Sequence, residues 1–182
     1  MADGESVPRL VLISGATGVG KTTLAKAIAH EMGLARIASS DTIREVMRAT
    51  ANSSDPALNR SSYGRGDVGD AGTDWEDAAR AVEPGIDAVV ERARQQGVDL
   101  VLEGVHVIPS RRLLSAWETA GGAAVGIVVK IEDEGTHRER IEKREANTWR
   151  GAERYRIGFE RIRSIQRTIE EKGAGAEWKV VD

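Results

Sequence analysis

The sequence predicts an α/β protein with a five-stranded parallel sheet and helices on both faces. Three observations support this fold class. Five short apolar segments, each typical of a buried strand, alternate with longer segments of helical periodicity. The first apolar segment runs directly into a glycine-rich motif, and a helical pattern follows that motif at once. The chain has 182 residues, 40% of them hydrophobic and 30% charged, so we expect residues 1–182 to form a single domain.

The first expected strand, residues 10–14, ends in a motif that binds phosphate. Residues 15–22 match the pattern G-x-x-x-x-G-K-[ST] at every specified position. Its glycines let the backbone wrap closely around an anion, and the N-terminus of the following helix adds partial positive charge. Lys21 would reach the β- and γ-phosphates, and the Thr22 hydroxyl would bind Mg²⁺. We therefore predict a nucleoside-triphosphate site formed by Gly15, Ala16, Thr17, Gly18, Val19, Gly20, Lys21, Thr22 and Thr23.

An acidic side chain follows the second expected strand, residues 34–38. Asp41 stands at the start of a helical pattern, where a carboxylate can cap the helix. In an open parallel sheet, ligands bind beyond the carboxyl ends of the strands, which would place Asp41 beside the phosphate loop. There it could take a proton from an attacking hydroxyl or organise water on Mg²⁺. Arg44, on nearly the same helical face, could bind a substrate phosphate or carboxylate, or could be a solvated charge.

Residues 51–74 differ in composition from the rest of the chain. They are rich in Ser, Gly and Asp and poor in apolar residues, which predicts a mobile substrate flap. Long loops within compact domains are often lids. Tyr63 could contact the substrate when this flap closes, or could be plain surface. We expect a helix over residues 75–96, in which Pro84 can introduce a kink or a break.

A second acid ends the third expected strand, residues 99–103. Glu103 resembles the acid of P-loop enzymes that helps to hold Mg²⁺ through water, although a capping or structural carboxylate is the alternative. His106 follows directly. A lone histidine is more often a structural hydrogen-bonding residue, but its place just after a strand also suggests contact with the substrate.

The last third of the chain is highly charged. After a fourth expected strand, residues 125–129, a helical pattern over residues 134–172 is interrupted near residues 146–151. Arg144 and Arg150 stand on either side of the start of this break. Arginines on a lid, expected here over residues 140–155, can stabilise charge on a transferring phosphoryl group. Most of the charges would simply be solvated. A fifth expected strand covers residues 178–181.

Composition narrows the class of protein. The net charge of −3 argues against a nucleic-acid partner but leaves a small anionic substrate open. No apolar run approaches the roughly 20 residues that a transmembrane helix needs, so we expect no membrane partner. Residues 1–8 form a polar, mobile lead-in without the features of a signal peptide, which predicts a cytoplasmic protein. The oligomeric state stays open.

Several longer motifs resemble one family. Residues 40–48 (SDTIREVMR), 61–63 (SSY), 103–109 (EGVHVIP), 154–155 (RY) and 162–166 (IRSIQ) are similar to the 2-phosphoglycerate kinase family of P-loop kinases. The chain also lacks N-K-x-D and D-x-x-G, the base-reading and switch motifs usual in GTPases. The resemblance implies a nucleoside-monophosphate-kinase-like fold with a flap and an arginine-bearing lid. It also implies ATP- and Mg²⁺-dependent phosphorylation of 2-phosphoglycerate to 2,3-bisphosphoglycerate.

These observations predict an active site. The expected catalytic residues are Lys21, Asp41, Arg144 and Arg150, and the expected metal ligands are Thr22 and, through water, Glu103. The acceptor would contact Asp41, Arg44, Tyr63, Glu103 and His106. Two kinds of alternative remain open. One is a kinase acting on another hydroxyl, that of an antibiotic, a sugar or an aminoacyl-tRNA, and the other is a nucleotide-binding regulator without an enzymatic role.

Overall fold

A single parallel sheet forms the frame of the molecule. The computed structural model describes residues 7–50, 55–66, 69–146 and 153–182. The strands are β1 (Arg9–Ser14), β2 (Ile37–Ser39), β3 (Leu100–Gly104), β4 (Ala123–Val129) and β5 (Lys179–Val181). All neighbouring strands are parallel, and their order across the sheet is β2-β3-β1-β4-β5. The predicted fold class, an α/β protein with a five-stranded parallel sheet, is confirmed.

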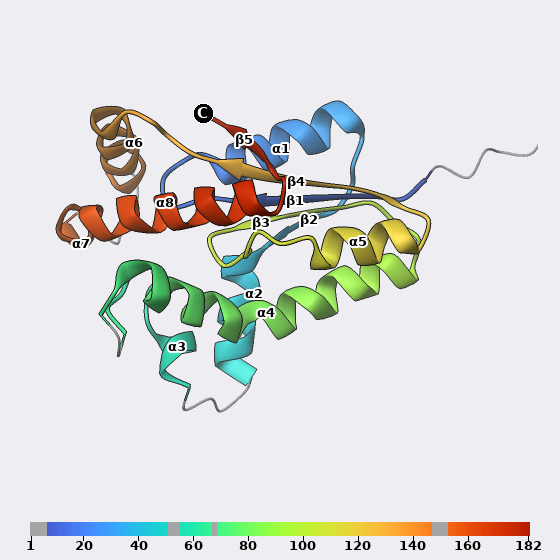
Figure 1. The fold of residues 1–182 in the computed structure, drawn as a ribbon, viewed down its shortest axis with the longest axis horizontal. Coiled ribbons are helices and arrows are strands. Elements are labelled where there is room, and N and C mark those ends of the chain that lie inside the picture. The colour runs from blue at the N-terminus through green and yellow to red at the C-terminus, as the bar shows by residue number, and fades with distance from the viewer. Residues whose placement is uncertain (1–6, 51–54, 67–68, 147–152) are drawn as a thin grey trace, which may run out of the picture.

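Helices cover both faces of this sheet (Figure 1). α1 (Lys21–Met32) lies on one face, and α4 (Ala71–Gln95) and α5 (Arg112–Thr119) lie on the other. The other described helices are α2 (Ser40–Thr50), α3 (Pro56–Asn59), α6 (Glu134–Glu145), α7 (Glu153–Ile157) and α8 (Phe159–Gly175). Within the described ranges, none of the helices is long and apolar enough to cross a membrane.

The central strand β1 feeds two hydrophobic cores. Leu10 and Leu12 belong to the core under α4 and α5, whereas Val11 and Ile13 belong to the core under α1. Successive side chains of a strand point to opposite faces, and a parallel strand covered on both faces is apolar throughout. This explains why residues 10–13 read as an uninterrupted apolar run. The buried strand gives the loop that follows it a rigid base.

α4 corrects the expected helix over residues 75–96. It starts at Ala71, where the Asp70 side chain caps it by accepting a hydrogen bond from the Thr73 N–H over 2.8 Å. It also continues through Pro84, which neither divides nor ends it. A proline inside a helix costs about 3 kcal/mol. Here ten buried residues along α4 outweigh that cost. Among them, Trp75 is fully buried and donates its indole N–H to the Val105 carbonyl over 2.7 Å.

The boundaries of the predicted flap, residues 51–74, are therefore wrong at its far end. Residues 71–74 are helical, and Pro56–Asn59 form the short helix α3, which the Asp55 carboxylate caps. Leu58 of α3 is buried, an apolar anchor that the polar composition conceals. Parts of three predicted mobile segments lie outside the described residues. They are residues 51–54 and 67–68 of the flap, residues 1–6 of the lead-in, and residues 147–152 of the lid predicted over residues 140–155. The mobility of these segments stays a prediction.

The end of β3 meets the start of α2 without space for another atom. A Cβ added at Gly104 would lie 1.8 Å from Ser40 Oγ and 2.6 Å from Ser40 Cβ. The helix start that carries Asp41 is thereby fixed against the sheet. Glycine is required at residue 104 because α2 approaches the backbone there.

We predict that Gly104→Ala lowers the free energy of unfolding by about 3 kcal/mol, because the new methyl group overpacks the contact with Ser40. Urea-induced unfolding measures this. Gly97→Ala is the matched control: Gly97 has φ of +61° but nothing within 4 Å of an added Cβ. Its cost should be about 1 kcal/mol, from backbone strain alone. Adding Ser40→Gly to Gly104→Ala should recover part of the loss. Equal losses in the two single variants would contradict the steric explanation.

Candidate active site

The loop between β1 and α1 has the geometry of an anion cradle. Gly18 has φ of +87°, and a Cβ there would lie 2.4 Å from Ile141 Cγ1. A Cβ at Gly15 would lie 2.4 Å from the Val129 carbonyl oxygen. α1 begins at Lys21 with Gly20 as its N-cap, and this N-cap has no side chain to accept a hydrogen bond from the first turn. The backbone N–H groups of that turn therefore remain available to an anion.

Lys21 spans the cradle. Its Nζ donates a hydrogen bond to the Ala16 carbonyl over 2.7 Å. Burial lowers the pKa of Lys21 to about 8, against the raising effect of Glu103 and Asp41, and nearby Arg144 lowers it further. The charge of Lys21 is therefore costly until a negative group arrives beside it. This is the electrostatic situation expected of a phosphate-binding lysine.

Thr22 and Glu103 form a pair of oxygen ligands next to Lys21. The Thr22 hydroxyl donates to Glu103 Oε1 over 2.9 Å. A hydroxyl and a carboxylate suit Mg²⁺, which commonly binds one or two protein oxygens and completes its shell with water and substrate phosphates. In the part of the chain that the structure describes, no group of three or more His, Cys, Asp and Glu side chains could hold a metal ion. The pair fits a shared metal site rather than a cage made by the protein alone.

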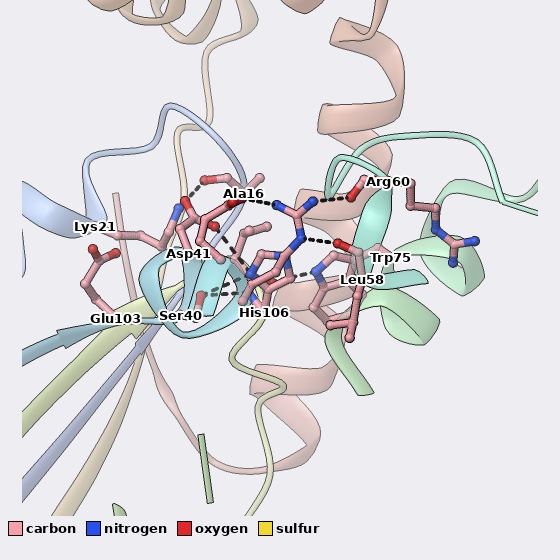
Figure 2. Close-up of polar contacts among 12 residues, drawn as sticks. Ala16, Lys21, Ser40, Asp41, Leu58, Arg60, Trp75, Glu103 and His106 are labelled. Atoms are coloured by element: carbon pink, nitrogen blue, oxygen red, sulfur yellow. Dashed lines mark hydrogen bonds and ion pairs between the residues drawn. The ribbon is translucent and has the colours of Figure 1, made fainter. Parts of the chain in front are cut away.

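Asp41 lies in the first turn of α2, one residue after the start of the helix. Its side chain is 70% exposed, and Figure 2 shows it at the carboxyl ends of the strands together with Lys21 and Glu103. The nearest group behind it is His106, whose Nδ1 lies 3.4 Å from Asp41 Oδ1 and 3.2 Å from Ser40 Oγ. Because the Asp41 carboxylate is exposed to the pocket and contacts His106 on its other side, it is available to accept a proton from a substrate.

His106 corrects the expected contact with the acceptor. It is only 1% exposed and lies beneath Asp41, away from the wall of the pocket. Burial lowers the pKa of His106 to about 4, against the raising effect of Asp41, so the ring is neutral at neutral pH. Among the described residues, its Nε2 has no hydrogen-bond partner, and His106 is one of the residues that line a cavity of about 10 Å³, the space that one water molecule needs.

One pocket of about 730 Å³ brings eight of the predicted site residues together. Its lining includes the following residues singled out from the sequence: Thr17, Lys21, Thr22, Asp41, Arg44, Tyr63, Glu103 and Arg144. This volume is typical of a site for a small molecule. The Asp41 carboxylate, the Lys21 ammonium and the Thr22–Glu103 oxygen ligands therefore all face the same pocket.

Arg44 does more than line this pocket. Its Nε donates to the Leu58 carbonyl over 3.0 Å, and its Nη2 donates to the Arg60 carbonyl over 2.7 Å (Figure 2). The Nε–Nη2 edge is thus occupied by the backbone and is not available for the predicted contact with a substrate phosphate or carboxylate. Arg44 ties α3 and the residues after it to α2. The remaining Nη1–Nη2 edge has Glu45 Oε1 3.5 Å from Nη1, so a substrate anion there would have to compete with that carboxylate.

The predicted lid arginines are placed unequally. Arg144, on α6, has a side chain that is 48% exposed, and its Nη2 lies 2.8 Å from Glu145 Oε1. Its guanidinium carbon lies 5.4 Å from the ring centroid of Tyr155, and the Tyr155 ring in turn packs at a tilt of 41° against that of Tyr63, with 5.3 Å between the centroids. Arg144 therefore belongs to the pocket wall. Arg150 lies outside the described residues.

Sequence reasoning missed the group that holds Tyr63 in place. Arg161 of α8 donates to the Tyr63 carbonyl over 3.1 Å and to Asp74 Oδ2 over 2.8 Å. Asp74 is buried, which alone would raise its pKa, but hydrogen bonds from Gly66, Arg161 and Gly69 outweigh burial and lower the pKa. The carboxylate thus stays ionised inside the protein. No spacing rule connects residues 87 positions apart, so the sequence held no signal for this pair.

Comparisons with known proteins agree with this geometry. The sequence profile of the AAA domain family matches residues 10–171. A 2-phosphoglycerate kinase from Methanopyrus kandleri is 35% identical over 177 residues, a match that covers 87% of this chain and 51% of that protein. One from Methanothermobacter thermautotrophicus is 33% identical over 177 residues, covering 90% and 56%. The chain thus spans about half the length of the curated relatives it matches, and the resemblance read from its motifs is confirmed.

A solved structure shows the same fold. A shikimate kinase from Bacteroides thetaiotaomicron superposes with a TM-score of 0.54 at 16% sequence identity. The match covers 97% of this chain and 87% of that one. At so low an identity, this likeness concerns the fold alone. It agrees with the expected nucleoside-monophosphate-kinase-like arrangement.

We predict that Asp74→Asn lowers the free energy of unfolding by about 3 kcal/mol at neutral pH, because it leaves the partly buried Arg161 without its counter-charge. The folded protein lowers the pKa of Asp74 below its ordinary value of 3.8, so its contribution is complete above that pH and is lost as the pH falls further. Urea unfolding of both proteins at neutral and acidic pH should show the difference shrinking in acid. Arg48→Ala, which breaks an exposed ion pair with Glu45, is the control and should cost less than about 0.5 kcal/mol. A difference independent of pH would contradict the role of the charge.

Proposed function

The chain belongs to the AAA domain family, and from its site and its named relatives we propose that it is a kinase using ATP and Mg²⁺. The acceptor is the hydroxyl of a small anionic metabolite. The named relatives support 2-phosphoglycerate as that acceptor, with 2,3-bisphosphoglycerate as the product. The same relatives give no support to an antibiotic, a sugar or an aminoacyl-tRNA as the acceptor. We further propose that the enzyme works in the cytoplasm.

One observation carries the proposal. The Lys21 ammonium, the Thr22–Glu103 pair and the Asp41 carboxylate all face one pocket of about 730 Å³. Phosphoryl transfer needs positioned positive charge for the phosphates and a base for the attacking hydroxyl. Both lie here at the carboxyl ends of parallel strands, where α/β proteins bind their ligands. A regulator that only binds nucleotide would not need the exposed carboxylate.

Each residue of the site has a distinct role in the proposed reaction. Backbone N–H groups at the start of α1, together with Lys21, bind the phosphates of ATP. Thr22 directly, and Glu103 through water, would hold Mg²⁺, which neutralises phosphate charge when bound. Asp41 takes the proton of the acceptor hydroxyl as its oxygen bonds to the γ-phosphorus. The bond from that phosphorus to the bridging oxygen breaks, and ADP leaves with the electron pair.

The remaining pocket residues surround the transferred group and the acceptor. Arg144 stands close enough to Lys21 to lower its pKa, so it can stabilise charge on the phosphoryl group in transit. We propose the same role for Arg150. Tyr63 and the Nη1 side of Arg44, which lies 3.5 Å from Glu45 Oε1, contact the acceptor.

We predict that the protein forms ADP and a bisphosphorylated product stoichiometrically from ATP and 2-phosphoglycerate. Lys21→Ala should lower kcat/KM by about 1,000-fold, because it removes a cation that stabilises the transition state. Product analysis by ³¹P NMR against a panel of small hydroxy acids checks this. Lys26→Ala, a change at an exposed residue of the same helix, should retain full activity. Transfer to another hydroxy acid alone would contradict the acceptor, and absence of any transfer would contradict the kinase.

We predict that Asp41→Asn lowers kcat by about 100-fold or more and leaves KM for the acceptor within a few-fold, because an amide cannot accept the proton. Steady-state kinetics separate the two parameters. Circular dichroism confirms that the variant is folded. Equal losses in kcat and in affinity would mean that Asp41 only shapes the site.

We predict that nucleotide binding takes up a proton near pH 8. Lys21 has a pKa of about 8 in the free protein, and the negative charge of the triphosphate raises it. At a pH equal to the free pKa, about half a proton enters per nucleotide, and affinity falls as the pH rises further. Calorimetry in buffers of different ionisation enthalpy measures the uptake. Lys21→Arg should abolish it, since a guanidinium stays protonated throughout.

A further inference from the structure

A buried histidine outside the predicted active site touches the phosphate loop. His137 of α6 is 0% exposed, and its Nε2 lies 2.8 Å from the Thr17 carbonyl oxygen. Its other ring nitrogen, Nδ1, lies 3.4 Å from Nη1 of Arg163 in α8. A histidine, a loop carbonyl and an arginine from three separate elements thus form one chain of contacts. None of the roles described above uses it.

The chemistry of the two neighbours fixes the proton on the ring. A guanidinium can only donate, so His137 Nδ1 must accept, and Nε2 must carry the hydrogen that goes to the Thr17 carbonyl. Arg163 is itself held, because it donates to the Ile131 carbonyl over 2.6 Å and to the Glu132 carbonyl over 3.0 Å. A protonated, charged ring would carry a second N–H at Nδ1, and that donor would face the N–H donors of the Arg163 guanidinium. The ring is therefore neutral and of one tautomer.

The electrostatics agree with that assignment. Burial lowers the pKa of His137, and the hydrogen bond to the Thr17 carbonyl raises it. The positive charges of Arg163, Lys21 and Arg140 lower it as well. His137 is thus neutral at neutral pH, as its contacts require.

The contact acts on a peptide group of the phosphate loop. The Thr17 carbonyl and the Gly18 N–H belong to the same planar trans peptide, so they point in opposite directions. A hydrogen bond that holds the carbonyl toward α6 therefore turns the Gly18 N–H away from α6. Ile141, one helical turn after His137, fills the space that a side chain at Gly18 would need. The hydrogen bond from His137 and the packing of Ile141 therefore fix the conformation of the same segment of the phosphate loop.

We propose that His137, oriented by Arg163, is a positioning residue that fixes the Thr17–Gly18 peptide so that the Gly18 N–H is directed at the phosphates of the nucleotide. The proposal rests on the proposed function in that the ligand of the loop is ATP. The same contact ties α6 to the loop. Arg144 lies two helical turns further along α6, on nearly the same face as His137, so its distance from the phosphates is also set.

Two variants test the role of His137 through MgATP affinity, measured by calorimetry. His137→Leu removes the donor that holds the Thr17 carbonyl, so we expect affinity to fall by about tenfold. His137→Gln keeps an N–H group near the position of Nε2 and should stay within about threefold of the unchanged protein. His30→Leu, at an exposed histidine of α1, is the matched control and should have no effect. Thermal unfolding shows which variants are folded.

A spectroscopic readout tests the geometry without any nucleotide. Two-dimensional ¹H–¹⁵N NMR of the unchanged protein should show His137 as the neutral tautomer protonated at Nε2. Arg163→Leu should let the ring exchange between tautomers. A ring protonated at Nδ1, or equal affinities in the Leu, Gln and unchanged proteins, would overturn the positioning role while leaving the kinase in place. Failure of the unchanged protein to bind MgATP would overturn the proposed function and this role with it.

Discussion

Parallel pairing of three strands in a fixed register sets the position of the acidic groups in this site. Ile13 of β1 pairs with Glu103 of β3, and Glu103 pairs with Ser39 of β2. Because all three strands leave the sheet at the same edge, the phosphate loop, Glu103 and Asp41 emerge side by side. Two hydrophobic cores hold this register, since a shift by one residue would exchange the faces of β1. The geometry of the pocket thus depends on apolar residues that never touch a ligand.

Local patterns predicted most of what lies at that edge. The phosphate loop follows β1 directly, Glu103 lies at the last but one position of β3, and Asp41 is the second residue after β2, so finding the ends of the strands was sufficient to place them. The same reasoning found Thr22 and Lys21, whose positions the start of α1 determines. For these residues, the order of strands and helices along the chain is enough to predict where the side chains lie.

Residues whose role depends on distant partners could not be placed in this way. His106 stands only three residues after Glu103, just beyond the end of β3, but packing against Ser40 turns it beneath Asp41. Arg44 was recognised as an anion-binding candidate, yet two backbone carbonyls from α3 and beyond occupy one edge of it. The contacts of Arg161 with Asp74 and of His137 with Thr17 join segments 87 and 120 residues apart. Sequence identifies such side chains but not their neighbours.

The burial of Trp75 has a practical consequence. Trp75 lies in the first turns of α4, next to Asp74 in the sequence. Its indole N–H donates to the carbonyl of Val105, the residue before His106 (Figure 2). Emission from an indole shifts when its surroundings become wetter or its hydrogen bond breaks. Trp75 is one of four tryptophans in the chain, and it is the one bonded to Val105, which lines the pocket. With the other three replaced, its emission would follow rearrangements there optically in solution, without an attached dye.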